Sequence, residues 1–459
     1  MASGKPVRIA LLGAGERGQV MFGIFVEKHP ELFEYVAVAE PNDERRERFV
    51  RRFGISEENA FSNWRELLEK PQLADAVINA MPDVHHYEST ILSLRKGYHV
   101  LLEKPMAQTP GECVSLAQEA EKQGLILQIF LECRYLELYQ RMKQLIDTEA
   151  IGRVMGMQAT ENLGYWHFIM SYVRGFARRS ADVISFLSAK GIHDFDLLTW
   201  FAGSRPVKVS SFGELTHFRP ENAPKGAPER CMDGCPIEDT CQFHAYRQYI
   251  KPGFPQIPPT LLTGITPGTL VDGYIKYPYL RSLAMYNLVS TDKKGRIEEI
   301  KTGPHGRCVY RCDNDVMDHQ VINVQYDGGI MASLSLSAFS VTWERTLNIN
   351  GTTGELYSKD FTGTLQMRTF NPKISVKRKR VRFNPLFHGG SDGLVLIDFA
   401  KSVQKKKAGT SGEILTGVQD AVDSHLLCFA AEEARKNDTV VDMVAFTEQA
   451  EKDAKKLGV

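Results

Sequence analysis

The sequence predicts an α/β protein that begins with a doubly wound parallel sheet. In the first third of the chain, short apolar runs alternate with helical patterns, the order that produces a parallel sheet. The first run leads directly into a glycine-rich turn. Later, residues 321–370 alternate apolar and polar side chains, as half-buried strands do. The four apolar runs are VRIALL, YVAVAE, ADAVINAMP and YHVLLEKP.

Length and charge narrow the class of protein. A chain of 459 residues exceeds what one hydrophobic core usually organises, so we expect two domains. The 56 basic and 56 acidic residues leave no net charge. This balance disfavours nucleic acid and acidic membrane surfaces as partners, and it favours small neutral ligands.

The sequence shows no signal for membrane insertion or export. No run of about 18 apolar residues occurs, and the N-terminal apolar stretch enters the glycine turn without a cleavage site, so we interpret it as a strand. The eight cysteines then indicate reduced thiols or a metal rather than a disulfide framework. These observations predict a cytoplasmic protein.

The glycine-rich turn has the spacing of a dinucleotide-binding loop. Gly13 permits the tight turn, Gly15 lets backbone N–H groups approach a pyrophosphate, and Gly18 allows the next helix to pack close to the strand. Glu16 and Arg17 lie in the same turn and are predicted to border the cofactor. The alternative is a plain turn between strand and helix, but the strand before it and the apolar helix pattern after it favour the cofactor loop.

The second apolar run ends on an acid that bears on the choice of cofactor. Glu40 follows Gly18 by about 20 residues, the separation at which a Rossmann acid binds the ribose hydroxyls of NAD. Because a carboxylate repels the 2′-phosphate of NADP, we predict NAD. Arg45 and Arg46 leave NADP open as an alternative, although the solvated face of a helix also explains them.

Further cofactor contacts are expected where the third and fourth runs end. In doubly wound sheets, ligands bind beyond the carboxyl ends of the strands. The side chains that follow these two runs are therefore predicted to line the cofactor site. They are Asn79, Met81, Pro82, His85, Glu103 and Lys104.

Together these motifs resemble the glucose-fructose oxidoreductase, inositol dehydrogenase and rhizopine catabolism (Gfo/Idh/MocA) family. The matching stretches keep the family's order over residues 7–200: the glycine loop, INAMPDVHHYESTILSLRKGYHVLLEKPMAQT with its Glu-Lys-Pro triplet, RYLELYQRMKQLIDTEAIGRV and GIHDFDLLTW. Two later stretches, CVYRCDNDVMDHQVINVQYDGGIMASLSLSAF and FHGGSDGLVLIDFAKSV, are similar to a bacterial branch that resembles sugar and glycoside dehydrogenases.

The resemblance implies a domain organisation. Residues 1–133 are expected to form an NAD-binding Rossmann domain, and residues 134–459 a second α/β domain with a large, open, mostly antiparallel sheet. The second domain is expected to bind substrate and to form a homo-oligomer, a dimer or a tetramer. Within it, residues 217–306 are rich in Pro, Gly and Tyr, which predicts an irregular insertion or a substrate-covering loop.

The resemblance also assigns catalytic groups. It implies that Lys104 lies beside the reacting hydroxyl and that His193, in AKGIHDFD, is the acid/base. The family commonly has Asp four residues before this histidine, where this chain has Ala189. Lys190 either adds a second positive charge or points away. Asp194 is a possible partner of His193, although adjacent helical residues face different directions; His193 is alternatively a helix cap or a core residue.

Other candidate ligands follow the remaining strand ends. The resemblance places Arg134 near the cofactor, and a surface ion pair with Glu132 is the alternative. Aromatic rings and polar groups suit the face of a sugar. The residues predicted to bind substrate on these grounds are Tyr165, Trp166, His167, Asp194, Asp315, Asp318 and His319. For the aromatic residues the alternative is packing in the core. For Asp315, Asp318 and His319 the alternatives are a metal site or a solvated turn.

A cysteine cluster lies inside the irregular insertion. RCMDGCPIEDTCQFH contains Cys231, Cys235 and Cys241, which predict a structural Zn²⁺ site in a stretch with little hydrophobic pattern. His244, Cys308 and Cys312 are alternative fourth ligands. The spacing matches no standard zinc motif, so unligated thiols remain the other interpretation.

We expect, from the resemblance, an NAD-dependent enzyme that oxidises a ring hydroxyl of a pyranose or glycoside, C3 first, to a ketone. An alternative is a glycosidase that retains its NAD and cleaves the bond by transient oxidation and elimination. A non-catalytic NAD-binding regulator is the alternative from another class, but such a protein is expected to lack the lysine of the triplet or the histidine, and both are present.

Overall fold

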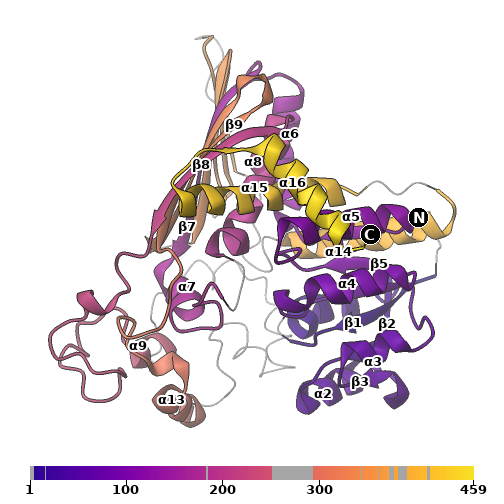
Figure 1. The fold of residues 1–459 in the computed structure, drawn as a ribbon, viewed down its shortest axis with the longest axis horizontal. Coiled ribbons are helices and arrows are strands. Elements are labelled where there is room, and N and C mark those ends of the chain that lie inside the picture. Colours follow the sequence, from indigo (N-terminus) through magenta and orange to yellow (C-terminus); the bar gives the residue numbers. More distant parts are fainter. Residues whose placement is uncertain are drawn as a thin grey trace.

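A computed structural model gives the fold of the chain (Figure 1). It describes residues 5–15, 17–181, 185–250, 293–341, 343–360, 362–371, 377–380, 390–410 and 414–458. Glu16, which was predicted to border the cofactor, lies outside the described residues, as does part of the predicted insertion. None of the helices in these ranges has the length and apolar character needed to cross a membrane.

The first sheet is the predicted doubly wound sheet. Its six strands are β1 (Val7–Leu12), β2 (Phe33–Ala39), β3 (Ala60–Phe61), β4 (Ala76–Asn79), β5 (His99–Leu102) and β6 (Leu127–Ile129). They lie in the order β3-β2-β1-β4-β5-β6, and every neighbouring pair is parallel. This is the Rossmann strand order, with the change of direction between β1 and β4, where such sheets bind dinucleotides.

Helices connect the strands of the first sheet. They are α1 (Gly23–Lys28), α2 (Asp43–Phe53), α3 (Trp64–Glu69), α4 (His86–Arg95) and α5 (Pro110–Lys122). A short π-helical segment, Arg17–Phe22, precedes α1 at the glycine loop. Their starts follow local sequence rules: at α5, Thr109 and Glu112 form a capping box, with proline in the first turn.

The second sheet is open and mostly antiparallel, as predicted. Its strands lie in the order β14-β13-β12-β11-β7-β10-β9-β8-β15, and only the pair β7 and β10 is parallel among the described pairs. The strands are β7 (Val154–Gly164), β8 (Pro206–Glu214), β9 (His319–Tyr326), β10 (Met331–Ser340), β11 (Glu344–Gly351), β12 (Gly354–Lys359), β13 (Thr364–Thr369), β14 (Lys377–Arg380) and β15 (Val441–Asp442).

Helices cover one face of the second sheet (Figure 1). In β10, buried Leu334, Leu336 and Ala338 alternate with more exposed residues, and they join the core beneath these helices. This alternation is what makes one face apolar and available for helix packing. The helices of this part are α6 (Glu137–Asp147), α7 (Tyr165–Phe168), α8 (Ile192–Ala202), α9 (Ala245–Tyr249), α13 (Lys293–Thr302), α15 (Val418–Asn437) and α16 (Met443–Lys456).

One helix from late in the chain packs against the first sheet. Val395, Leu396 and Phe399 of α14 (Ser391–Lys407) share a core with Ile9 and Leu11 of β1. Residues 391–407 follow the expected domain boundary by more than half the chain, yet they cover the Rossmann sheet. In Figure 1 this long helix lies beside the N-terminal strands.

Candidate active site

Two of the three glycines in the loop after β1 stand where a side chain would collide with the backbone. Gly13 has φ +89°, and a Cβ there would lie 2.8 Å from the carbonyl oxygen of Ala80. A Cβ on Gly18 would lie 2.3 Å from the carbonyl oxygen of Gly13. Around Gly15, by contrast, no described atom lies within 4 Å of the added Cβ. The loop is therefore tightly packed at both ends and open in the middle, where a pyrophosphate fits.

Glu40 at the end of β2 is tied to this loop. Its carboxylate is buried and accepts hydrogen bonds from the backbone N–H of Ala14, at 2.8 Å, and of Asn42, at 3.0 Å. A carboxylate has about four lone-pair sites, so acceptor capacity remains for a ribose. Arg46 donates to the Glu40 carbonyl and pairs with Asp43. The acid thus borders the loop, while Arg46 is engaged with Glu40 and Asp43.

Asn79 at the end of β4 holds the adjoining helix. It is fully buried and donates to the hydroxyls of Ser89 and Thr90 at 2.7 and 3.1 Å. Met81 and Pro82 follow it in the loop, and Pro82 immediately precedes the short turn that leads into α4. A cofactor contact of Asn79 through its side chain therefore remains a prediction.

His85 is exposed, and it is the next residue, His86, that joins two loops of the site. The Nδ1 of His86 lies 2.6 Å from the Pro105 carbonyl, and its Nε2 lies 2.9 Å from the Met81 carbonyl. Sequence reasoning missed this residue. The pair of histidines directly after the third strand is the only signal that marks it.

Arg17 and Glu103, both predicted to contact the cofactor, bind each other. Arg17 Nε donates to Glu103 Oε1, and its guanidinium lies 4.8 Å from the centre of the Phe130 ring. Asp392 of α14 lies 3.7 Å from the same guanidinium. These contacts fix the backbone that carries the next residue, Lys104, whose peptide bond to Pro105 is cis.

Two lysines meet beyond β5. Lys104 Nζ donates to the Ala189 carbonyl at 3.0 Å, and burial lowers the pKa of Lys104. Lys190, the next residue along that turn, lies with its Nζ 4.7 Å from the centre of the Trp343 ring. Burial and the charge of Lys104 lower the pKa of Lys190 to about 7. At neutral pH this amine is therefore neutral in a large fraction of molecules.

The carboxylate beside His193 comes from another element than expected. His193 Nδ1 lies 3.5 Å from Glu132 Oε2, and both side chains are buried. Glu132 opens the short helical turn after β6. Ala189 stands where the resemblance implies Asp, and the carboxylate that the structure places beside His193 is Glu132, from the end of another strand.

Asp194 is engaged elsewhere. It accepts from Arg345 Nε at 3.2 Å, and that guanidinium also pairs with Glu161 at 2.9 Å. Burial raises the pKa of Asp194 to about 7, against the opposing effect of Arg345. Asp194 was considered as a partner of His193 because the two residues are adjacent in the sequence. In the structure they have different partners, because adjacent residues of a helix face different directions.

Glu132, Cys133 and His193 are the one group of potential metal ligands that lie within 4.8 Å of one another in the described chain. Burial raises the pKa of the Cys133 thiol well above its ordinary value. Within this group His193 Nδ1 already lies 3.5 Å from Glu132, an arrangement that suits a proton carrier with its carboxylate.

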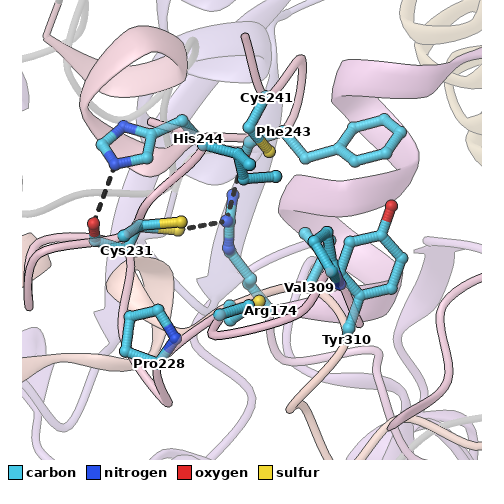
Figure 2. Close-up of a pocket in the computed structure, with 13 residues that line it drawn as sticks. Arg174, Pro228, Cys231, Cys241, Phe243, His244, Val309 and Tyr310 are labelled. Atoms are coloured by element: carbon cyan, nitrogen blue, oxygen red, sulfur yellow. Dashed lines mark hydrogen bonds between the residues drawn. The ribbon is translucent and has the colours of Figure 1, made fainter. Parts of the chain in front are cut away.

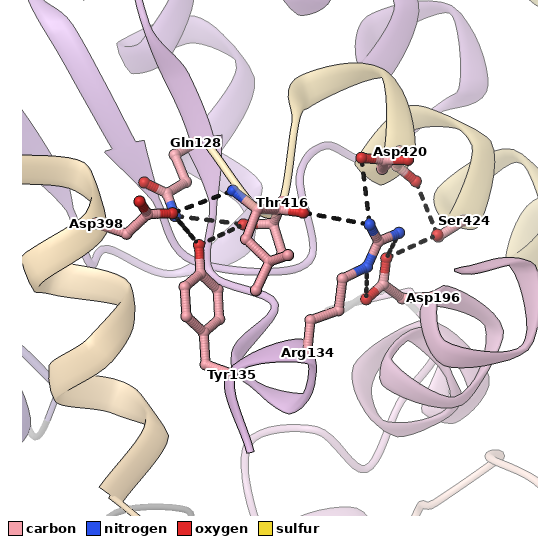
Figure 3. A network of polar contacts seen from close by, with 9 residues as sticks. Gln128, Arg134, Tyr135, Asp196, Asp398, Thr416, Asp420 and Ser424 are labelled. Atoms are coloured by element: carbon pink, nitrogen blue, oxygen red, sulfur yellow. Dashed lines mark hydrogen bonds and ion pairs between the residues drawn. The ribbon is translucent and has the colours of Figure 1, made fainter. Parts of the chain in front are cut away.

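Arg134 forms a clamp between distant segments (Figure 3). Its Nε and Nη2 donate to the two carboxylate oxygens of Asp196 at 2.9 and 2.7 Å, and its Nη1 donates to the Leu415 carbonyl at 3.3 Å. Asp420 of α15 lies 3.3 Å away. Each guanidinium nitrogen thus has a partner in an ion-pair network, and a contact of Arg134 with the cofactor stays a prediction.

The three aromatic residues after β7 separate into different surroundings. His167 stacks on Trp343, with ring centres 5.2 Å apart and an angle of 10° between planes. Lys190 contacts the same indole, so His167 and Lys190 lie in one cluster around Trp343. Tyr165 packs against Phe243 at 6.3 Å, and Trp166 packs beside the cysteine segment.

The acidic residues before β9 hold loops. Asp315 accepts from the backbone N–H and hydroxyl of Ser180, at 2.7 and 2.8 Å. Asp318 is fully buried and accepts from His217 N at 2.7 Å, while exposed His319 pairs with it at 2.8 Å. In the described part of the chain, these contacts do not involve the two lysines or His193. Their role in substrate binding stays a prediction.

The predicted metal residues gather around a small cavity (Figure 2). Cys231, Cys235 and Cys241 line it together with Cys308. His244, the first alternative for a fourth ligand, has its Nε2 2.8 Å from the Cys231 carbonyl instead. Cys308 is thus the fourth cysteine that the fold brings to the cluster.

Comparison with known proteins gives two family matches. Residues 7–131 match the model of an oxidoreductase family with an NAD-binding Rossmann fold, GFO_IDH_MocA, and residues 139–245 match the C-terminal domain model of the same family. The two matches adjoin the end of the first sheet and together cover half of the chain.

Individual relatives are more distant. The Bacillus subtilis protein YteT is 26% identical over 71% of this chain and 71% of its own length. Levoglucosan dehydrogenase of Pseudarthrobacter phenanthrenivorans is 27% identical over 34% of this chain, and D-glucoside 3-dehydrogenase of Escherichia coli is 28% identical over 32%. These matches span 40% and 41% of the two dehydrogenases.

Solved structures share the fold over nearly the whole chain. A levoglucosan dehydrogenase in complex with NADH and levoglucosan has a TM-score of 0.66 at 16% identity, over 96% of this chain and 100% of that one. An oxidoreductase from Agrobacterium radiobacter in complex with NAD⁺ has a TM-score of 0.64 at 14% identity, over 96% and 99%. With the glycine loop, the Glu-Lys-Pro triplet and the two family matches, these findings show that the chain belongs to the Gfo/Idh/MocA family of NAD-binding oxidoreductases.

Proposed function

We propose that this protein is an NAD-dependent dehydrogenase that oxidises a ring hydroxyl of a pyranose or glycoside to a ketone, with C3 the first position to examine. One arrangement carries the proposal. Lys104, Lys190 and His193 converge beyond the carboxyl ends of β5 and β6, the edge at which a Rossmann sheet binds its cofactor.

The glycine loop suits NAD. The open space at Gly15 is where backbone N–H groups can approach the pyrophosphate, and Glu40 is placed to accept from the ribose hydroxyls. Met81 and Pro82 are proposed to border the nicotinamide half. When bound, NAD supplies the ring that accepts the hydride from the sugar carbon.

Oxidation of an alcohol also requires a group that takes the hydroxyl proton. Lys190 suits this task because its pKa is about 7. Lys104, with its pKa also lowered, is proposed to hydrogen-bond the reacting hydroxyl. His193 is proposed as the next proton carrier, and Glu132 at 3.5 Å stabilises the charge that His193 acquires.

The substrate class follows from the surroundings and the relatives. The stacked rings of His167 and Trp343 lie beside Lys190 and suit the apolar face of a pyranose. Two relatives are named levoglucosan dehydrogenase and D-glucoside 3-dehydrogenase, which supports a sugar and C3.

A screen of free sugars and glycosides for NAD reduction tests this function. We expect NADH to form with a pyranose or glycoside, in equal amount to a keto-sugar identified by mass spectrometry. Glycoside cleavage without net NADH would instead indicate the NAD-retaining glycosidase. Tight NAD binding with no turnover of any sugar would indicate a regulator.

We also propose that the open sheet face forms a homo-oligomer. Phe212 of β8 and Val321 of β9 lie opposite each other and are 64% and 43% exposed, and Met331 of β10 is 53% exposed. Exposed apolar side chains on a sheet face favour a protein partner. Light scattering of the purified protein tests this, and a monomer at working concentration would contradict it. The cytoplasmic location stays a prediction.

A further inference from the structure

The cavity lined by cysteines is not explained by hydride transfer. Its volume is about 10 Å³, which is about the space that one ion or one water molecule needs. Two segments far apart in sequence form it, because Cys231 N donates to the Gly306 carbonyl and Cys308 N donates to the Glu229 carbonyl, each at 2.9 Å. The backbone therefore holds Cys231 and Cys308 side by side, while Cys235 and Cys241 follow on the same loop.

A buried cation beside the cavity needs an anion. Arg174 is fully buried, and its guanidinium donates to the carbonyls of Arg307 and Phe243, to Gln248 and, at 3.3 Å, to Cys231 Sγ. In the ranges that the structure describes, no carboxylate pairs with it. A buried charge without a counter-charge is costly. Figure 2 shows the guanidinium between Cys231 and Phe243, directed at the sulfur.

We propose that Cys231, Cys235, Cys241 and Cys308 bind one structural Zn²⁺ as thiolates, with Arg174 as the balancing cation. Four thiolates and Zn²⁺ carry two net negative charges, and the guanidinium offsets one of them. Binding releases the four thiol protons to solvent. No electron is transferred, because Zn²⁺ has no redox chemistry.

The four sulfur atoms lie farther apart than a zinc site requires. No three of the four sulfur atoms lie within 4.8 Å of one another in the described chain, whereas a tetrahedral site with Zn–S bonds of about 2.3 Å needs sulfurs about 3.8 Å apart. Zn²⁺ binding therefore requires rotation about the Cα–Cβ bonds to bring the sulfur atoms together.

Two neighbouring residues have other partners and are left out of the proposed ligand set. Cys312 does not line the cavity, and its thiol donates to the Cys308 carbonyl at 3.3 Å. His244 directs Nε2 at the Cys231 carbonyl. Cys312 therefore offers a matched control, since a serine at this position can make the same hydrogen bond.

The site lies under the segment that carries the aromatic residues of the proposed substrate pocket. Cys231 packs in one cluster with Met170, Tyr249 and the partly buried Trp166. Zn²⁺ is thus expected to fix this segment from behind, outside the region of hydride transfer.

Elemental analysis of the full chain, purified without chelator, tests the proposal. We expect about one zinc per chain in the natural protein and in Cys312→Ser, and less than about a tenth of that in Cys235→Ser and Cys308→Ser. Cys235 is partly exposed, so its variant is expected to fold.

Cobalt provides a second measurement that needs no variant. After chelation, the natural chain is titrated with Co²⁺, and we expect the thiolate-to-metal absorption and the visible bands of tetrahedral cobalt. Zinc-free protein that gives no such absorption would overturn the proposal. Loss of zinc from Cys312→Ser to the same degree as from Cys235→Ser would also overturn this choice of ligands.

Discussion

Replacing Lys190 with methionine is expected to stabilise the fold while it slows the reaction. Burial, together with the charge of Lys104, lowers the pKa of Lys190 from 10.5 to about 7. The unfolded chain keeps the ordinary value, so between about pH 7 and 10.5 it binds a proton that the folded chain does not. The free energy of unfolding therefore falls as pH drops through this window, and it stays lowered below about pH 7.

The size of the effect follows from the two pKa values. Their difference corresponds to about 5 kcal/mol, an upper limit because Lys190 is only partly buried. Loss of the contact with Trp343 costs about 0.5–1 kcal/mol in return. We expect Lys190→Met to gain about 1–2 kcal/mol at about pH 6. Each kcal/mol raises Tm by about 2–4 °C in domains of about 150–250 residues, and by less in a larger domain such as this one.

Calorimetric unfolding across pH is the assay. The advantage of Lys190→Met over the natural protein should be constant below about pH 7 and shrink as pH rises towards 10. Lys122→Met, at an exposed lysine of α5, is the control and should show no such trend. A Lys190→Met protein that is less stable at about pH 6, or whose difference does not vary with pH, would refute the reasoning.

Three other predictions concern the reaction. Glu132→Gln keeps the shape of the side chain but removes the charge 3.5 Å from His193. In steady-state assays kcat should therefore fall roughly 10- to 100-fold, with NAD affinity unchanged. A normal kcat would contradict this prediction. kcat/KM should rise through about pH 7, and Lys190→Met should lose that rise. Calorimetric titration should show tighter binding of NAD than of NADP because of Glu40, and tighter NADP would contradict that assignment.

Local rules made the cofactor half of the site predictable. Gly13 and Gly18 stand where any Cβ meets backbone atoms, and such constraints act within a few residues of a strand end. The alternation in β10 likewise specified which side of the second sheet is buried. These features depend on neighbours in sequence, so the chain alone was enough to predict them.

Pairings across the fold were not predictable in the same way. Asp194 and Arg345 are 151 positions apart, and Arg134 and Asp196 are 62 apart. The packing of α8 against β11 brings the first pair together, and the packing of α8 against the turn after β6 brings the second. No local pattern marks either partner. The carboxylate beside His193 was missed for this reason, since Glu132 comes from another strand end.

The position of α14 shows the same limit at the scale of domains. The helix pattern of residues 391–407 gives no sign of which sheet it will cover. Its apolar side chains Val395, Leu396 and Phe399 fit either core in composition. The choice is made by the path of the whole chain, which periodicity does not record.

NAD reduction by Lys104→Ala, on the best sugar from the screen, tests the central claim most directly. Lys104 is the residue that the proposal places at the reacting hydroxyl. The account predicts that Lys104→Ala keeps its fold and NAD affinity but loses turnover by roughly a hundredfold or more. His193→Ala should lose nearly as much turnover, and the surface control Lys122→Ala should keep normal turnover. Near-normal turnover by Lys104→Ala would contradict the account and leave the Glu-Lys-Pro triplet as no more than the end of a strand.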